Sequence, residues 1–317
     1  MTTHRDLNLD VATGISQGRR EHQEDAIVSD FPIGGEIGLA VLADGMGGHA
    51  AGDIASKIAV TEVFSELKIR ASDPEIFVRN APLFLRSAAD GANACIAGHI
   101  RAHTETRGMG TTLIALAVAG DRLFWLSVGD SPLFLFRDGR LAQINEDHSL
   151  APQIDNMARM GLLSPEEARH HPDRNCLTSA ITGTPLGQVD CPVTPLDLAP
   201  GDILIAASDG LTSIEIARIG TILSKTRKRS SAEIARVLFE ELEAIADPDQ
   251  DNVCFSVIRV VQGSAQAGRH AGIHPFGQRA LRFWRGGAAT ARPRQAGGSW
   301  AASLIARLFI GLRRPAP

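Results

Sequence analysis

The feature that most constrains this chain is a glycine-rich segment that directly follows an apolar run. Residues 39–43 read Leu-Ala-Val-Leu-Ala, and Asp44-Gly45-Met46-Gly47-Gly48-His49 come next. A buried strand that ends on a carboxylate and then breaks into glycines leaves its backbone open to close approach. Mg²⁺ and Mn²⁺ take about six oxygen ligands from carboxylates, carbonyls and water. The segment therefore fits a divalent-cation site, although taken alone it fits a plain strand-to-helix turn equally well.

Four more acidic sites occur where strands should end. They are Glu24-Asp25 before the apolar residues 26–28, Asp130 after residues 122–128, Asp209 after residues 201–207, and Asp251 before residues 253–258. Each one singly is more typical of a turn or a cap. Five in one chain are hard to explain as turns, and carboxylates that gather in one place repel each other unless cations neutralise them. The pattern therefore predicts a metal site.

Six motifs in this order resemble those of the bacterial branch of the metal-dependent type 2C Ser/Thr protein phosphatases. They are Arg-x-x-x-Glu-Asp (20–25), Asp-Gly-Met-Gly-Gly-His-x-x-Gly-x-x-Ala-Ser (44–56), Gly-Thr-Thr (110–112), Val-Gly-Asp-Ser (128–131), Ser-Asp-Gly-Leu (208–211) and Asp-Asn (251–252). The resemblance covers residues 10–261. It implies an α+β fold, a four-layer α-β-β-α sandwich of two mostly antiparallel sheets with a binuclear metal cleft at the strand ends.

The resemblance also implies a set of metal ligands. Asp44 would bridge two Mn²⁺ or Mg²⁺ ions, and the Gly45 carbonyl, Asp209 and Asp251 would complete the protein ligands. Two cations about 4 Å apart lower the pKa of a bridging water and yield a hydroxide that attacks a phosphomonoester. They also offset charge on the phosphoryl oxygens.

Three further carboxylates have less central expected roles. Glu24 would act through water, and Asp25 either does the same or touches a metal directly. Asp130 would suit a third, weaker cation site, but capping of a tight hairpin is an equal alternative. Ser213 stands where many family members place Asp or Asn, which weakens the case for a third site.

Two residues are expected to act on the substrate. Arg20 would hold the substrate phosphate through a two-pronged guanidinium contact that Lys could not reproduce. The alternative is a surface arginine that pairs with Glu21. His49 is the candidate general acid that protonates the departing Ser or Thr oxygen. Its alternative is a helix-start histidine that the backbone satisfies.

The coarse pattern of elements agrees with one such domain. Strands are expected at 11–16, 25–31, 37–43, 190–197, 203–208 and 253–261, with three β-rich runs between 111 and 144. Helices are expected from Ala50, at 74–103, 213–223 and 231–246, and the first has a buried face of Ala51, Ala55, Ala59, Val63 and Leu67. Residues 145–187 read as an irregular, substrate-facing flap.

The charge is distributed unevenly along the chain. Of the 32 Lys and Arg residues, nine fall in residues 262–317, which hold no Asp or Glu, so residues 1–261 carry 23 basic and 36 acidic residues, a net charge of −13. This acidic balance argues against nucleic-acid binding by the domain. The N-terminus lacks an apolar signal region, so the expected location is the cytoplasm, with peripheral contact at the inner membrane as an option.

Residues 262–317 are expected to form a separate, flexible tail rich in Gly, Ala and Arg. Within it, residues 299–312 have an amphipathic helical pattern that is too short to span a bilayer. An anchor on anionic lipid, docking on a partner or on the acidic body, and plain disorder all remain open.

The favoured function is hydrolysis of phosphoserine and phosphothreonine in proteins, which would counteract a Ser/Thr kinase. Three alternatives remain. They are a pseudophosphatase that binds phosphoproteins without turnover, a phosphatase dedicated to one anti-sigma-factor antagonist or one secretion apparatus, and a phosphomonoesterase for small molecules. The intact set of Asp44, Asp209 and Asp251 argues against a decayed site.

Overall fold

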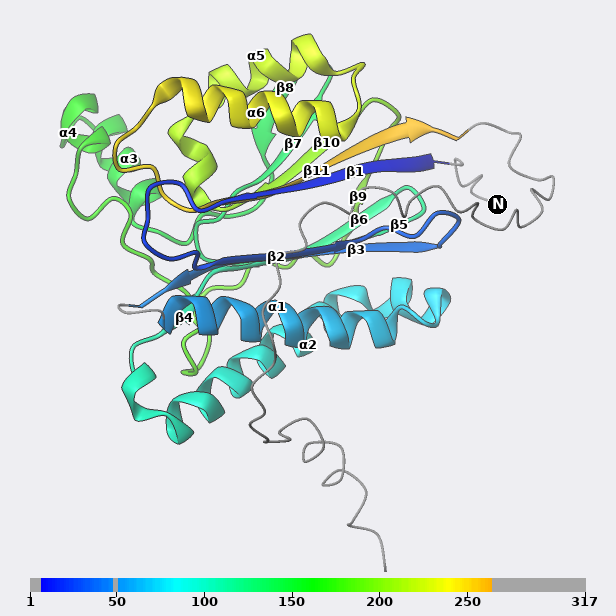
Figure 1. Cartoon of the computed structure of the whole chain (residues 1–317), viewed down its shortest axis with the longest axis horizontal. Coiled ribbons are helices and arrows are strands. Elements are labelled where there is room, and N and C mark those ends of the chain that lie inside the picture. The colour runs from blue at the N-terminus through cyan, green and yellow to red at the C-terminus, as the bar shows by residue number, and fades with distance from the viewer. Residues whose placement is uncertain (1–6, 48–50, 264–317) are drawn as a thin grey trace, which may run out of the picture. The chain divides into compact units, whose positions relative to one another are not determined.

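Two antiparallel sheets lie face to face, with a pair of long helices on the outside of each (Figure 1). The structure is a computed structural model, and it describes residues 7–47 and 51–263. All of these residues belong to one compact unit. The expected α-β-β-α sandwich is confirmed. Much of the tail that was expected at 262–317, from residue 264 onward, lies outside the described residues.

The first sheet has five strands. In spatial order they are β1 (Leu7–Ser16), β11 (Val253–Gln262), β10 (Ile203–Ala207), β7 (Leu133–Arg137) and β8 (Arg140–Gln143). Every neighbouring pair is antiparallel, and β1 pairs with β11 over ten residues, from Leu7 opposite Gln262 to Ser16 opposite Val253. The first and the last described strands of the chain are therefore neighbours in one sheet.

The second sheet has six strands. Five follow in spatial order, β2 (Asp25–Asp30), β3 (Ile37–Met46), β5 (Leu113–Ala119), β6 (Arg122–Val128) and β9 (Leu196–Asp197), and β4 (Gly110–Thr111) pairs with the end of β3. Nearly every residue of β3 and all of β5 are buried, because a sheet covered on both faces by a helical layer and a second sheet exposes neither side.

The helices cover the two outer faces. On the second sheet lie α1 (Ala51–Arg70) and α2 (Pro74–Ala102), and on the first lie α5 (Ile216–Thr226) and α6 (Ser231–Ile245). The predicted stripe Ala51, Ala55, Ala59, Val63 and Leu67 is buried throughout. The alanines of this stripe let α1 approach the sheet closely. A separate apolar cluster, which includes Leu42, Leu116 and Ile258, fills the space between the sheets.

The remaining elements are short. They are α3 (Ala151–Arg159), α4 (Pro165–Arg169), and the 3₁₀ helices η1 (Thr104–Thr106) and η2 (Asp209–Ser213). The segment expected to be a flap thus contains α3 and α4, which Arg174 helps to join by donating two hydrogen bonds to Asp155, at 2.6 and 2.9 Å, and one to the Ala168 carbonyl.

The strand expected at 190–197 is largely wrong. Only β9 and an isolated bridge between Ser127 and Asp190 form there. Pro192 and Pro195 lack the N–H groups that a strand ladder needs, so pairing is confined to the two ends of the segment.

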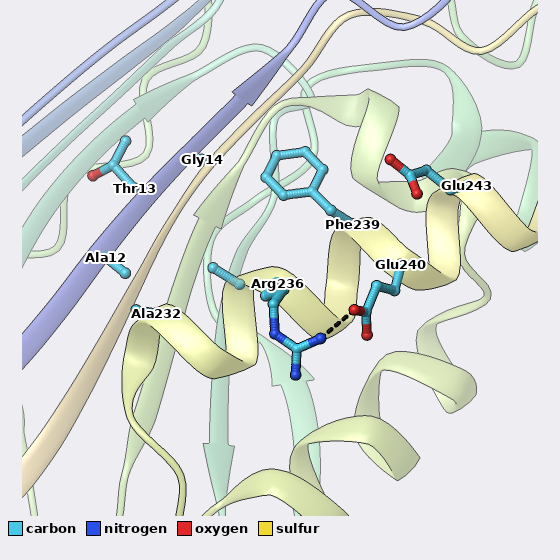
Figure 2. A pocket seen from close by; sticks show the side chains of 9 residues that line it. Ala12, Thr13, Gly14, Ala232, Arg236, Phe239, Glu240 and Glu243 are labelled. Atoms are coloured by element: carbon cyan, nitrogen blue, oxygen red, sulfur yellow. Dashed lines mark hydrogen bonds and ion pairs between the residues drawn. The ribbon is translucent and has the colours of Figure 1, made fainter. Parts of the chain in front are cut away.

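A hollow of about 510 Å³ lies between β1 and α6 (Figure 2). The Phe239 ring is directed at Gly14, where an added Cβ would come within 2.4 Å of the ring. Arg236 and Glu240 form an ion pair along α6 at the rim. Gly14 thus allows α6 to pack tightly against the edge strand.

Across residues 7–47 and 51–263, no helix combines the length and apolar character that a bilayer crossing requires.

We expect Gly14→Ala to lower the free energy of unfolding by about 1–3 kcal/mol, because the new methyl group overpacks the contact with Phe239. Urea denaturation measures this change. Gly98→Ala is the control, since Gly98 lies in α2 with only the flexible end of Arg101 nearby, and its helix propensity should raise stability by about 1 kcal/mol. Equal stability of Gly14→Ala and the parent would contradict the packing argument.

Candidate metal centre

Acidic side chains from both sheets meet at one end of the sandwich. A cavity of about 460 Å³ opens there between the end of β3, the start of η2, the residues before β11 and the loop between β1 and β2. Its lining consists of Arg20, Glu21, His22, Glu24, Asp44, Gly45, Met46, Gly47, Asp209, Asp251 and Asn252. Residues more than 200 positions apart in the sequence therefore face the same space.

Strand register places Asp25 next to Asp44. The two residues are direct partners in the β2–β3 pair. Asp25 is 3% exposed, and its Oδ2 accepts a hydrogen bond of 2.7 Å from the hydroxyl of Ser208. Ser208 directly follows β10 of the other sheet and accepts a hydrogen bond from the Cys254 N–H. This contact ties the two sheets together directly beneath the cavity.

The backbone of Asp44 is held by two threonines. Its N–H donates to the Thr112 hydroxyl at 3.0 Å, and its carbonyl accepts from the Thr111 hydroxyl at 2.8 Å and the Thr112 N–H at 2.9 Å. Thr112 also shares a hydrogen bond with Ser131, which follows Asp130. The hydrogen bonds to the Asp44 main chain thus fix the position from which its carboxylate projects.

Glycines allow the start of α1 to approach the end of β3. A Cβ on Gly45 would lie 2.2 Å from the Gly52 carbonyl oxygen and 2.5 Å from the Glu24 carbonyl oxygen. A Cβ on Gly52 would lie 2.8 Å from the Gly45 carbonyl carbon. No side chain fits at either position, so both glycines are required by packing at the floor of the cavity.

Arg20 reaches across the cavity mouth. Its guanidinium donates to Asp251 Oδ2 at 2.6 Å, and the two side chains are 57% and 40% exposed. The other oxygen of Asp251 accepts from the Asn252 N–H at 2.7 Å. Arg20 therefore lies where an anion that enters the cavity would meet it.

Asn252 organises the loop that carries Arg20 and Glu24, a role that sequence reasoning missed. Its Oδ1 accepts from the Glu24 N–H at 2.7 Å, and its Nδ2 donates to the carbonyls of Gln17 at 2.8 Å and His22 at 2.9 Å. The side chain is 5% exposed. The Asp-Asn motif marks this position in the sequence, but the contacts of Asn252 form only because strands more than 200 residues apart pair with each other.

Asp130 stands at the turn that carries the chain from one sheet to the other. Gly129 before it has a φ of +102°, and a Cβ there would lie 2.7 Å from Thr112. The N–H of Gly129 donates to Nδ1 of His148, a 1% exposed side chain, and its carbonyl accepts from the His148 N–H. His148 thus holds the turn from both sides, and no sequence motif pointed to it.

The carboxylates shift each other's protonation. Burial, then the charges of Asp25 and Asp209, raise the pKa of Asp44 well above its ordinary value. Burial raises the pKa of Asp25 to about 7 against the lowering effect of hydrogen bonds from Ser208 and Cys254. Burial, with Asp209 and Asp147, raises the pKa of Asp130 to about 7. The pKa values of Asp209 and Glu24 are also raised, mainly by burial. The charged forms of these carboxyls are thus disfavoured unless a cation compensates them.

These residues fit a hard divalent cation by their chemistry. Asp25 Oδ1 is buried and has no hydrogen-bond partner within the described part of the chain, and the donors around the cavity are carboxylate and carbonyl oxygens. Among the described residues, however, no three His, Cys, Asp or Glu side chains already stand in a metal-ligating arrangement.

The structure brings most of the predicted site residues together. Arg20, Glu24, Asp44, Gly45, Asp209 and Asp251 line the cavity. Asp25 lies behind it, bound to Ser208, and Asp130 is close enough to raise the pKa of Asp44. His49, the predicted general acid, lies outside the described residues.

Comparison with known proteins identifies relatives. The model of the protein phosphatase 2C family matches residues 16–174. The serine/threonine protein phosphatase PstP of Mycobacterium tuberculosis is 34% identical over 223 residues, which cover 70% of this chain and 40% of PstP. The chain thus spans about two-fifths of the length of that relative. A serine/threonine phosphatase of Listeria welshimeri is 32% identical over 259 residues, which cover 80% of this chain and 96% of the relative.

A solved structure agrees with these relatives. The catalytic domain of the serine/threonine protein phosphatase PstP in complex with two manganese ions aligns with a TM-score of 0.64 and 31% identity. The alignment covers 80% of this chain and 99% of the solved one.

The metal-free protein should lose stability as the pH rises from 5 to 7.5. A carboxyl whose pKa folding raises from 3.8 to about 7 contributes stability that is fully present below 3.8 and is lost as the pH rises through about 7. Asp130→Asn removes one such group, so its stability should fall less than that of the parent, by on the order of 2 kcal/mol. Urea denaturation in the presence of a chelator measures the difference. Parallel pH profiles of the two proteins would refute it.

Asn252→Ala should loosen the loop that carries Arg20 and cost about 1–3 kcal/mol, because two carbonyls and one N–H lose a buried partner. Hydrogen exchange should accelerate selectively for the amides of residues 17–24. Asn80→Ala is the control, because Asn80 bonds only within α2 and alanine favours a helix. Unchanged exchange in the loop would contradict the role of Asn252.

Proposed function

Because this chain belongs to the protein phosphatase 2C family, we propose that it hydrolyses phosphoserine and phosphothreonine in proteins, with divalent cations in the acidic cavity. The observation that carries the proposal is the convergence of carboxylates from both sheets on one cavity whose mouth holds an arginine. In such a site bound cations supply positive charge, which acidifies water and offsets charge on the phosphoryl oxygens.

Asp44, the Gly45 carbonyl, Asp209 and Asp251 would hold the cations. They lie at the ends of β3 and β10 and just before β11, all on the cavity wall. Asp25 would support this set from behind, with its Oδ2 bound to Ser208 and its unpartnered Oδ1 left to bind a cation directly or through water. Glu24, on the cavity lining, would bind water that belongs to the site.

Arg20 would bind the phosphate of the substrate. Its guanidinium is exposed and already pairs with one carboxylate oxygen of Asp251, so a phosphate oxygen could replace that partner. The planar fork binds two oxygens at once, which orients the phosphorus atom, and a lysine offers no such fork. His49 remains our candidate for donating a proton to the departing Ser or Thr oxygen, on the basis of its position in the sequence motif.

A phosphorylated side chain on a protein surface can reach this cavity. The side chains of Arg20 and Asp251 at its mouth are 57% and 40% exposed, so the phosphate can enter from outside. The choice between a protein and a small-molecule substrate rests on the family of the relatives.

Several finer points belong to the same proposal. Either Mn²⁺ or Mg²⁺ suits the oxygen donors. Asp130, whose pKa is raised by burial and then by Asp209 and Asp147, would take part in a third and weaker cation site. The biological role would be to reverse a cognate Ser/Thr kinase in the cytoplasm of a bacterium, with contact of the tail to the inner membrane as a secondary element.

The test is hydrolysis of a phosphothreonine peptide with and without Mn²⁺. We expect activity that a chelator abolishes, and a loss of roughly 100-fold or more in kcat/KM for Asp209→Asn. Asp249→Asn is the matched control, because Asp249 is an exposed acid two residues before Asp251 that does not line the cavity.

The outcomes separate the alternatives. Turnover that resists the chelator, or a fully active Asp209→Asn, would contradict the proposed chemistry. Binding of the phosphopeptide without turnover would favour the pseudophosphatase. Faster hydrolysis of nucleotides than of phosphopeptides would favour a small-molecule phosphomonoesterase.

A further inference from the structure

The turn between α5 and α6 carries an isolated group of cations. Residues 225–229 read Lys-Thr-Arg-Lys-Arg, and the four basic side chains are exposed. We call these four, Lys225, Arg227, Lys228 and Arg229, the basic turn. Within the described residues, none of them forms a salt bridge. The charge of Arg229 acts on Glu233, and the charge of Lys225 acts on Glu241. Both carboxylates already have another partner, because Glu233 accepts a hydrogen bond from Ser230 and Glu241 accepts one from Arg218.

The basic turn is held on a rigid support. Thr226 is buried, and its hydroxyl donates to the Ile222 carbonyl at 2.7 Å, while its carbonyl accepts from the Arg229 N–H at 2.7 Å. The guanidinium of Arg259 on β11 donates to the Arg227 carbonyl and to Asp10 on β1, each at 3.0 Å. The backbone that displays the four cations is therefore anchored to both strands.

Stabilisation of α5 does not account for all four charges. Lys225 lies in the last turn of that helix, where a cation offsets the helix dipole, and Arg227 is the C-cap. Lys228 and Arg229 lie beyond the helix, where this effect fades. Four like charges within five residues repel each other, although the rest of the domain is acidic. A polyanion bound to the basic turn would offset this repulsion.

The basic turn and the acidic cavity lie at opposite ends of the same strand. Arg259, which contacts the turn, is six residues after Val253, and Asp251 of the cavity precedes Val253. Six strand residues span about 20 Å. In Figure 1 the arrow of β11 points to the right, so the turn lies toward the right, and the start of β11, which follows the cavity-lining Asp251 and Asn252, lies toward the left. A surface that bound the basic turn would leave the cavity open.

We propose that the basic turn docks the domain on an anionic phospholipid bilayer, with the cavity facing away from the membrane. The chain beyond β11 favours a bilayer over other polyanions. Gly263 is four residues after Arg259, and residues 262–317 add nine Arg, no acid and the amphipathic pattern at 299–312. Basic clusters and amphipathic segments act together on anionic lipid. A nucleic acid offers no apolar layer for the amphipathic pattern at 299–312.

The test is sedimentation of the full chain with vesicles of phosphatidylcholine alone or mixed with phosphatidylglycerol. Binding should require the anionic lipid and should disappear at about 1 M salt, where the screening length is about 3 Å. The variant Arg227→Gln, Lys228→Gln, Arg229→Gln should bind the anionic vesicles roughly 100-fold more weakly. The matched control is Arg79→Gln, Arg101→Gln, Arg140→Gln, three exposed cations elsewhere on the domain.

Each outcome decides the proposal. Weaker binding of the first variant, with the control unchanged and both variants equal to the parent in thermal stability, supports docking by the basic turn. Equal binding of both variants would assign any membrane contact to the tail and overturn the proposal. Tighter binding to duplex DNA than to the anionic vesicles, or binding to phosphatidylcholine alone, would overturn it as well. None of these readouts depends on phosphatase activity.

Discussion

Mutual repulsion among buried carboxylates is the constraint on which the rest of this structure depends. Asp25, Asp44, Asp130 and Asp209 all have raised pKa values because folding takes them out of water and brings them together. Such a cluster persists only if its backbone is held firmly, because the electrostatic energy falls when any one carboxylate moves away from the others. The hydroxyls of Thr111, Thr112 and Ser208, the amide of Asn252 and the bare backbone of Gly45 and Gly52 provide that hold.

The sandwich architecture explains how distant residues reach one site. Each sheet brings acids to the same end, Asp25 and Asp44 from β2 and β3, and Asp209 and Asp251 from the residues next to β10 and β11. Asp130 lies where the chain crosses from β6 in one sheet to β7 in the other. Antiparallel register, and not sequence proximity, therefore determines which carboxylates face each other. The helices outside the sheets contribute burial and rigidity to this arrangement.

Much of this arrangement could be predicted from the sequence. The apolar stripe from Ala51 to Leu67 predicted α1, and acids next to apolar runs marked the strand ends that meet at the cavity. The first four residues of β1 were missed, because Asn and Asp are uncommon in strands, although Leu-Asn-Leu-Asp alternates apolar and polar residues and pairs with the end of β11. Asn252 and His148 were also missed. Their partners, Glu24, Gln17, His22 and Gly129, are set by tertiary contacts that no local pattern encodes.

The hydrogen bond between Ser208 and Asp25 has a consequence for assembly. This bond joins two sheets that each carry part of the carboxylate cluster. A chain with one sheet formed and the other open would therefore contain only part of the set that we propose to bind cations. Cations would bind such an intermediate only weakly, so they would not stabilise the native structure of either sheet. They would stabilise the molecule only after both halves had closed, because ligand binding favours the state that contains the complete site. Cation binding would then stabilise only fully folded molecules, at the last stage of folding.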